Sequence, residues 1–332
     1  MADSDDAAAI GNPTGTIEVD EEEIDKPAVS YLHSSATSVA SEVHKYRVEN
    51  GRQYHGYRDG AYLLPNDRRE QERMEMEHRL FRLVLEGRLY LSPLTKDLRK
   101  VLDLGTGTGS WALDFAQRHP NSRVLGTDLS PIQRLWCPRN CIFEIDDFEA
   151  EWPYQPFASF DFIHARNIAG SVSDYDKLFD QAFDHLSPGG YLELQSLEAK
   201  FFSDDGTDKR AVTATQWQQL LLIGSEKFGK RLDVEDGWRE KMEKAGFIDV
   251  ADVSFKVPLR PWAKDPKLRQ LGELQAIQIK ESIESYSLAL FTRILGWTVD
   301  ELDILLTAVR NDFSDPRSHL YGRMRFIYGR KP

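Results

Sequence analysis

Apolar and polar positions follow two different periods along most of the chain. From residue 99 onward, short runs of apolar residues alternate with stretches in which apolar residues recur every three or four positions. The runs are typical of buried strands, and the stretches are typical of helices packed by one face. The strands predicted in this way span 100–104, 123–128, 141–145, 159–165 and 191–196. This alternation predicts a parallel sheet with helices on both faces.

Capping residues mark where several helices begin. Asp67 followed by Glu70 resembles a capping pair in front of a helical apolar pattern, and Asp174 can cap a later helix that ends at the Ser-Pro-Gly-Gly segment. The helices expected from these signals and from apolar spacing span 67–90, 111–119, 175–186, 207–230, 238–245, 266–294 and 299–312. Two further strands are predicted at 249–257 and 320–332.

Changes in amino-acid composition and apolar pattern divide the chain into three parts. Residues 1–40 are polar and acidic and lack a sustained period, so we expect a disordered tail, with a partner-binding arm as the alternative. Residues 41–98 are expected to be an ordered segment that is rich in aromatic residues and ends in the first helix. Residues 99–332 are expected to form one domain with helical insertions at about 200–245 and 262–312.

A glycine-rich loop follows the first strand of this domain and opens a helix. It reads Val-Leu-Asp-Leu-Gly-Thr-Gly-Thr-Gly, with glycines at Gly105, Gly107 and Gly109. A dinucleotide-binding loop has the spacing G-x-G-x-x-G, which would place the third glycine at position 110, where the chain has Ser110. Asp103 lies two residues before the first glycine, where a carboxylate disfavours a pyrophosphate and favours an ammonium group.

Carboxylates also follow the next two strands. Asp128 ends the second strand, where it can accept hydrogen bonds from ribose hydroxyls, and Asp146 and Asp147 follow the third, where an acceptor can read an adenine amino group. Three acids at three strand ends, without a phosphate-binding lysine, indicate a ligand with an amine, a ribose and an adenine. S-adenosylmethionine has these groups, and its sulfonium tolerates nearby acids and aromatic faces.

These segments strongly resemble the class I S-adenosylmethionine-dependent methyltransferases over about residues 99–196. The resemblance implies a Rossmann-like α/β fold: a mostly parallel seven-stranded sheet with an antiparallel C-terminal strand, helices on both faces, an N-terminal lid over residues 41–98 and a helical cap. It assigns Asp103 and the glycine loop to the methionine part of the cofactor, Asp128 to the ribose, and Asp147 with Phe148 to the adenine. The full set of expected cofactor-binding residues is Asp103, Gly105, Thr106, Gly107, Gly109, Asp128, Leu129, Asp147, Phe148, Tyr54 and Arg166.

A narrower resemblance covers about residues 46–332 and is to the LaeA-like fungal methyltransferases. It is based on the segment from Glu49 to His78, on Ile-His-Ala-Arg-Asn-Ile-Ala-Gly at 163–170 and on the ending Tyr-Gly-Arg-Lys-Pro. This family includes tailoring enzymes of natural products and regulators of secondary metabolism. Three functions therefore stay open: methyl transfer to a hydroxyl, carboxyl or amine of a small molecule, regulation through protein partners of the acidic tail, and a non-methylating reaction that uses the same cofactor.

A methyltransferase needs a general base only when the acceptor must lose a proton. Two histidines are candidates for this role: His164 at the end of the fourth strand and His55 in the aromatic segment, where Tyr54, Tyr57 and Tyr62 would be lid aromatics. A structural histidine at 164 is the alternative. Arg166 could also orient an acidic substrate or pair with an acid. His78 and His119 are expected at the surface of their helices.

Charge and composition limit the partners. The net charge is −12, and residues 1–26 contribute −8 of it, so the other 306 residues carry only −4. A nucleic-acid partner is disfavoured because neither part has a strongly positive field. No apolar run approaches the ~20 residues of a membrane span, and the N-terminus does not resemble a signal peptide. Cys137 and Cys141 lack metal-ligand spacing, so we expect no metal and a cytoplasmic protein, with a nuclear location as the alternative.

Overall fold

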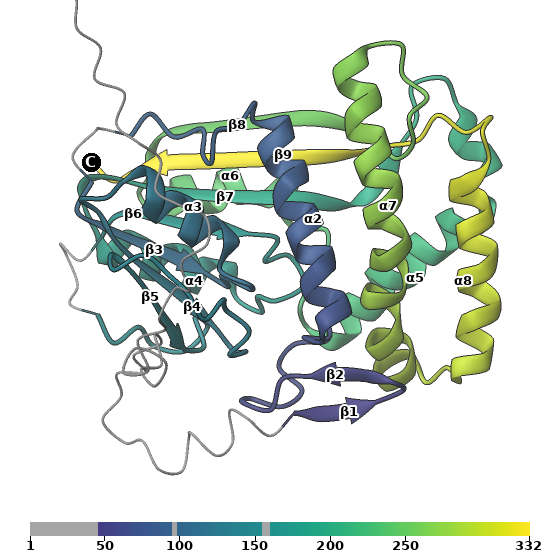
Figure 1. Ribbon diagram of the computed structural model, residues 1–332, viewed down its shortest axis with the longest axis horizontal. Helices are drawn as coiled ribbons and strands as arrows, with labels where there is room; N and C mark the ends of the chain where they lie inside the picture. Colours follow the sequence, from purple (N-terminus) through teal and green to yellow (C-terminus); the bar gives the residue numbers. More distant parts are fainter. Residues whose placement is uncertain (1–45, 95–97, 155–159) are drawn as a thin grey trace, which may run out of the picture.

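A twisted seven-stranded sheet organises the computed structural model, which describes residues 46–94, 98–154 and 160–332 (Figure 1). The predicted acidic tail lies outside these residues. The strand order is β5-β4-β3-β6-β7-β9-β8. The strands span Cys141–Ile145 (β5), Arg123–Asp128 (β4), Lys100–Leu104 (β3), Phe160–Arg166 (β6), Leu186–Phe202 (β7), Tyr321–Arg330 (β9) and Ile248–Pro258 (β8). Strands β3 to β7 pair in parallel, and β9 runs antiparallel to both β7 and β8. The expected mostly parallel sheet with an antiparallel C-terminal strand is confirmed.

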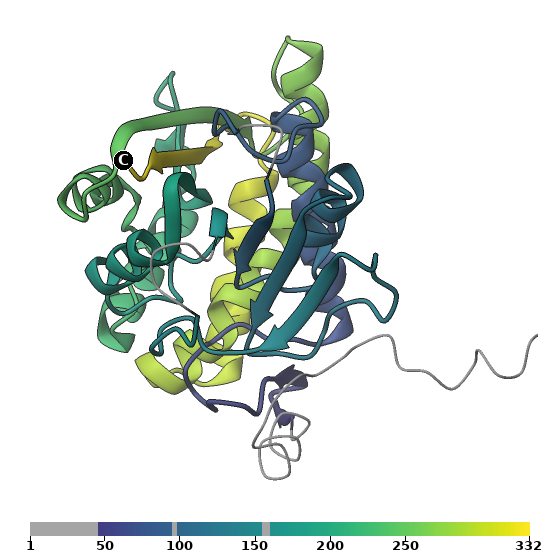
Figure 2. The ribbon, with the colours of Figure 1, turned by 90° about the vertical axis from the view of Figure 1, so that its left-hand side faces the viewer.

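Both faces of the sheet are covered, because successive residues of a strand point to opposite faces. In β6, Phe162 packs in a cluster with helix α3 (Ser110–Arg118), whereas Ile163 packs in a cluster with α4 (Tyr175–His185) and α6 (Trp238–Lys244). Figure 2 shows α4 and α6 on the side of the strands opposite to α3. Both residues are fully buried, which explains why these strands have continuous apolar runs.

A group of helices stands beside one end of the sheet and has its own apolar core (Figure 1). We call this group the cap. It contains α5 (Val212–Phe228), α7 (Pro266–Ala289), the π-helical turn η3 (Leu290–Leu295) and α8 (Val299–Ser314). Its core includes Trp217, Phe291 and Phe313. The short 3₁₀ turns η1 (Thr207–Arg210) and η2 (Glu235–Gly237) precede α5 and α6.

Helix α2 (Arg68–Val84) lies between the sheet and α7, as Figure 1 shows. A two-stranded hairpin, β1 (Arg47–Glu49) and β2 (Arg52–Tyr54), precedes it. Arg52 in this hairpin is buried and forms ion pairs with Asp67 (2.6 Å) and Glu284 (3.3 Å), which connect the hairpin to the start of α2 and to α7.

The structure corrects several predicted boundaries. The helix expected over 67–90 ends at Val84, because Glu86 and Gly87 both have positive φ and turn the chain in the left-handed region. The Ser-Pro-Gly-Gly segment is part of β7 and extends the expected strand on its N-terminal side. The hairpin was not predicted, because two three-residue strands contain too little alternation to show a period. Among the described residues, no helix has both the length and the apolarity that crossing a membrane requires.

Candidate functional site

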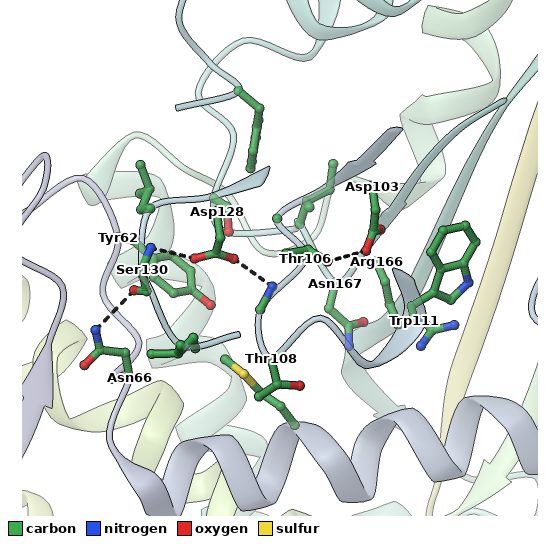
Figure 3. Close-up of a pocket in the computed structure, with 18 of the residues that line it drawn as sticks. Tyr62, Asn66, Asp103, Thr106, Thr108, Trp111, Asp128, Ser130, Arg166 and Asn167 are labelled. Atoms are coloured by element: carbon green, nitrogen blue, oxygen red, sulfur yellow. Dashed lines mark hydrogen bonds between the residues drawn. The ribbon is translucent and has the colours of Figure 1, made fainter. Parts of the chain in front are cut away.

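An open pocket of about 1190 Å³ lies at the carboxyl ends of β3, β4, β5 and β6, beside α2 (Figure 3). Parallel strands place these ends at one edge, where open α/β sheets bind ligands. The pocket wall brings together most of the residues singled out in the sequence: Asp103, Gly105, Thr106, Gly107, Asp128, Leu129, Asp147, Phe148, His164 and Arg166.

The glycine loop wraps tightly between β3 and α3. Gly105, Gly107 and Gly109 all have φ between 57° and 80°, the left-handed region in which side chains are strained. At Gly109, a Cβ atom would lie 2.5 Å from Cζ of Phe143, so this glycine is required by packing as well as by conformation. Gly109 is the N-cap of α3 and lies behind the pocket wall. The Thr106 hydroxyl donates to Oδ2 of Asp103 (2.6 Å) and holds the loop against the strand.

Asp128, at the end of β4, faces the loop and is held by two backbone groups. The N–H of Gly107 donates to its Oδ2 (2.8 Å), and the N–H of Ser130 donates to its Oδ1 (2.9 Å), as Figure 3 shows. Burial raises the pKa of Asp128, and the two N–H donors oppose that rise. The carboxylate therefore has a fixed direction toward the pocket.

Asp103 and His164 form a buried pair on neighbouring strands. His164 Nδ1 lies 2.7 Å from Asp103 Oδ1, and the imidazole stacks on Trp111 with ring centroids 3.7 Å apart. Burial lowers the pKa of His164, although Asp103 opposes the shift, so the ring is neutral near pH 7. A neutral ring that donates from Nδ1 leaves Nε2 as an acceptor, and this atom has no hydrogen-bond partner among the described residues.

Arg166 is a half-buried cation at the end of β6. Its guanidinium donates to Oε1 of Gln195 and to Nδ1 of His78 (3.0 Å), and it lies over the ring of Phe81. Burial lowers its pKa to about 10. No carboxylate forms a direct ion pair with it in the part of the chain that the structure describes, so its positive charge is available to the pocket.

His78 corrects an expectation, because it was predicted at the helix surface. It is 9 % exposed and lines the pocket, where Nε2 contacts Asp114 (3.1 Å) and Nδ1 accepts from Arg166. Burial lowers its pKa. His119 is half-buried and stacks on Phe115 (ring centroids 4.2 Å apart), so it is not a purely surface residue either.

Asp147 and Phe148, which follow β5, complete the wall on the far side of Asp128. Arg58, from the segment after the hairpin, pairs with Asp147 at 3.5 Å. Among the expected lid aromatics, only Tyr62 lines the pocket. Before α2, the lid segment therefore contributes Ala61, Tyr62, Pro65 and Asn66 to the site rather than its first aromatics.

Tyr54 and His55 are not brought to the pocket wall. Tyr54 is 2 % exposed in the core of the cap and lies under the guanidinium of Arg293 (4.3 Å). The two ring nitrogens of His55 face the backbone carbonyls of Tyr57 (2.6 Å) and Tyr62 (3.2 Å). His55 thus has no nitrogen directed toward a ligand in this pocket.

Several pocket residues were missed in the sequence. Glu77 and Met74 come from α2, Asn167 follows β6, Lys230 follows α5, and Tyr286 comes from α7. Asn167 directly follows Arg166 at a strand end, so its position along the chain could have indicated it. Tyr286 had no such signal, since it reaches the pocket from a helix that is more than one hundred residues away along the chain.

Comparisons with known proteins show the family of the chain. A methyltransferase domain family model matches residues 76–251. The chain is 39% identical over 325 residues to methyltransferase pytC of Aspergillus terreus. The aligned region covers 96% of this chain and 97% of pytC. It is 36% identical over 290 residues to the secondary metabolism regulator laeA of Aspergillus fumigatus. The aligned region covers 86% of this chain and 76% of laeA. Similarity to a solved phosphoethanolamine N-methyltransferase of Haemonchus contortus is remote (18% identity, TM-score 0.43, 79% of this chain and 52% of that one).

Proposed function

This chain belongs to the S-adenosylmethionine-dependent methyltransferases, and from that premise we propose that it transfers a methyl group to a hydroxyl, carboxyl or amine of a small molecule in fungal secondary metabolism. One observation carries the proposal. Carboxylates lie at the carboxyl ends of three neighbouring strands around a tight glycine loop, and a half-buried cation completes the same pocket.

The residues of the pocket fit the chemical groups of S-adenosylmethionine. Asp103 would pair with the amino group of the methionine part, and Arg166 with its carboxylate. Asp128 would accept hydrogen bonds from the ribose hydroxyls, and Asp147 with Phe148 would contact the adenine. The glycines let the loop approach the ligand closely. The sequence also assigned five further residues to the cofactor site. Gly105, Thr106, Gly107 and Leu129 line the pocket, and Gly109 lies behind its wall as the N-cap of α3.

The bound cofactor supplies a methyl group on a sulfonium, a carbon already activated for in-line displacement. The task of this chain is therefore to position the acceptor and exclude water, which can supply most of the acceleration. Trp111 and Met74 contribute apolar surface to the wall. We assign His164 a positioning role: its Nδ1 orients Asp103, while its ring is 0 % exposed and stacked on Trp111.

Calorimetry and mass spectrometry test this function together. The full chain is titrated with S-adenosylhomocysteine, and candidate metabolites are then incubated with the protein and S-adenosylmethionine. We expect binding, and a product heavier than its acceptor by one methylene unit. Failure to bind the cofactor at any accessible concentration overturns the function. Binding and turnover of an acceptor without that mass gain would instead support the non-methylating alternative.

The similarity to laeA supports a second candidate, regulation through protein partners. The acidic tail within residues 1–40 is the segment that would bind a partner. In that case, deletion of residues 1–40 abolishes partner binding and leaves cofactor binding intact. If no partner is lost on deletion, this candidate fails.

A further inference from the structure

A second cavity, of about 750 Å³, lies beside the first, between β7, α5 and α7. The two cavities share three wall residues: Glu77, Asn167 and Tyr286. Asn167 has φ of 53°, and its Oδ1 accepts from the N–H of Leu197 (2.8 Å), which fixes it at the junction. A molecule in the second cavity would therefore adjoin a molecule in the first.

Part of the wall of the second cavity is apolar and aromatic. Trp217 and Leu221 come from α5, Phe313 comes from α8, and Leu259 follows β8. The indole N–H of Trp217 donates to Oγ of Ser287 (2.7 Å), and its ring meets that of Phe313 edge to face (centroids 6.0 Å apart). These fixed rings suit a flat apolar body.

The wall formed by α7 is polar. Gln275, Gln278, Ser282 and Tyr286 are spaced by three and four residues, so they lie on one helix face. With a rise of 1.5 Å per residue, this face runs for roughly 16 Å from Gln275 to Tyr286. It adjoins the junction at two places, at Tyr286 and at Gln278, which contacts Glu77. Such a length suits a fused-ring molecule with one end at the cofactor pocket.

Two oxygens of this cavity's wall residues are buried without a donor. Gln275 and Gln278 are 2 % and 1 % exposed, and neither Oε1 atom accepts a hydrogen bond from any residue within the described ranges. Gln278 Nε2 donates to Glu77 Oε1 (3.1 Å), which fixes the direction of that amide.

We propose that the second cavity binds the methyl acceptor, and that it selects a flat aromatic molecule bearing hydroxyl or N–H groups. These groups would donate hydrogen bonds to the Oε1 atoms of Gln275 and Gln278. This rests on the proposed function. Buried acceptor oxygens without donors disfavour a ligand that lacks donors. An anionic acceptor is disfavoured as well, because Lys200, the lysine among the described wall residues, already pairs with Asp233 at 3.7 Å.

A matched pair of probes tests the donor requirement. Emodin, a flat trihydroxyanthraquinone, is compared with its tri-O-methyl ether by calorimetry, using the full chain saturated with S-adenosylhomocysteine. We expect emodin to bind at least about tenfold more tightly than the ether, the factor of a lost hydrogen bond. Equal affinity, or no binding of either probe at millimolar concentration, overturns the proposal.

Substitutions on α7 test whether its glutamines cause the preference for emodin over the ether. Gln275→Leu and Gln278→Leu should reduce the preference for emodin to within about threefold, since each removes an acceptor. Gln270→Leu, at an exposed position of the same helix, is the matched control and should keep the full preference. An unchanged preference in both cavity variants overturns the proposal.

Thermal unfolding separates ligand recognition from a structural role. Gln275→Leu removes a buried oxygen without a donor, so its Tm should equal or exceed that of the wild type, whereas a structural glutamine would lower it. Gln275→Met, of similar volume, replaces the leucine variant if that variant does not fold. Loss of S-adenosylhomocysteine binding in the wild type would refute the proposed function, while binding without a probe preference would refute only the acceptor assignment.

Discussion

The two cavities of this protein lie side by side but are built in opposite ways. The pocket that we propose for the cofactor comes mainly from strand ends between residues 103 and 168, and its carboxylates are already oriented: Asp103 by Thr106 and His164, Asp128 by two backbone N–H groups. The second cavity joins residues from 77 to 322 and leaves buried oxygens without donors in the described chain. The first is preorganised for one ligand, whereas the second keeps groups that only a particular ligand would pair.

The largest expected effect concerns the packing that preorganises the cofactor pocket. Gly109→Ala should lower the free energy of unfolding by about 2–5 kcal/mol, because it adds strain at positive φ to a clash with the ring of Phe143. Gly206→Ala, at a similar φ but in open space, should cost only about 1–2 kcal/mol. Equal losses in urea denaturation would show that packing at Gly109 has no role.

The next largest effect concerns Glu235, a buried carboxyl group that contacts the wall of the second cavity. Burial raises the pKa of Glu235 from 4.5 to about 7, and Ser196, which lines that cavity, donates to its carboxylate. The native state therefore binds more protons than the unfolded state between about pH 4.5 and 7, so stability falls as the pH rises through this window. Glu235→Gln should remove this dependence, which amounts to up to about 3 kcal/mol.

Denaturation at several pH values checks this expectation. The free energy of unfolding of Glu235→Gln, relative to wild type, should increase steadily from pH 4.5 to 7 and then level off. Glu240→Gln, at an exposed position of the neighbouring helix, is the control and should show no such increase. A difference that stays constant with pH would contradict the raised pKa.

A smaller effect separates cofactor binding from folding. Asp128→Ala should weaken S-adenosylhomocysteine binding by about 1–3 kcal/mol, the range for a lost hydrogen bond to a charged group. Asp180→Ala, an exposed carboxylate on α4, should leave the affinity unchanged in the same calorimetric titration. Unchanged affinity in Asp128→Ala would contradict its assignment to the ribose.

The smallest effect tests whether the cap can be destabilised without a change in cofactor affinity. Thr298 is the N-cap of α8, and its hydroxyl accepts from the N–H of Glu301 in a capping box. Thr298→Ala should lower the free energy of unfolding by about 1 kcal/mol, because one orphan donor of the helix start loses its partner. Cofactor affinity should not change. A parallel loss of affinity would show that the two regions do not behave separately.

The cofactor side was largely predictable because its signals are local. Asp103, Asp128 and Asp147 each lie in or just beyond the end of a strand of strong apolar pattern, and parallel pairing brings the ends of neighbouring strands to one edge. His78 shows where this reasoning stops. A charged helical neighbourhood suggested a surface position, but the packing of α2 buries the ring beside its partners Asp114 on α3 and Arg166 on β6.

The hairpin shows the same limit. Tyr54 and His55 were expected beside the cofactor, yet Tyr54 packs into the cap and His55 is bound to backbone carbonyls. Which core they would join depends on the ion pairs of Arg52 with Asp67 and Glu284, and a partner 232 residues away leaves no local pattern.

The sequence by itself determined the sheet, its strand ends and the chemistry of the loop around Gly105–Gly109, because apolar period, glycine spacing and capping act over a few residues. Only the tertiary structure decided that α2 and α7 meet, which pairs Glu77 with Gln278 across 201 residues and opens a second cavity beside the first. Contacts of that range are selected by the packing of whole helices, and the same apolar face could pack against more than one partner.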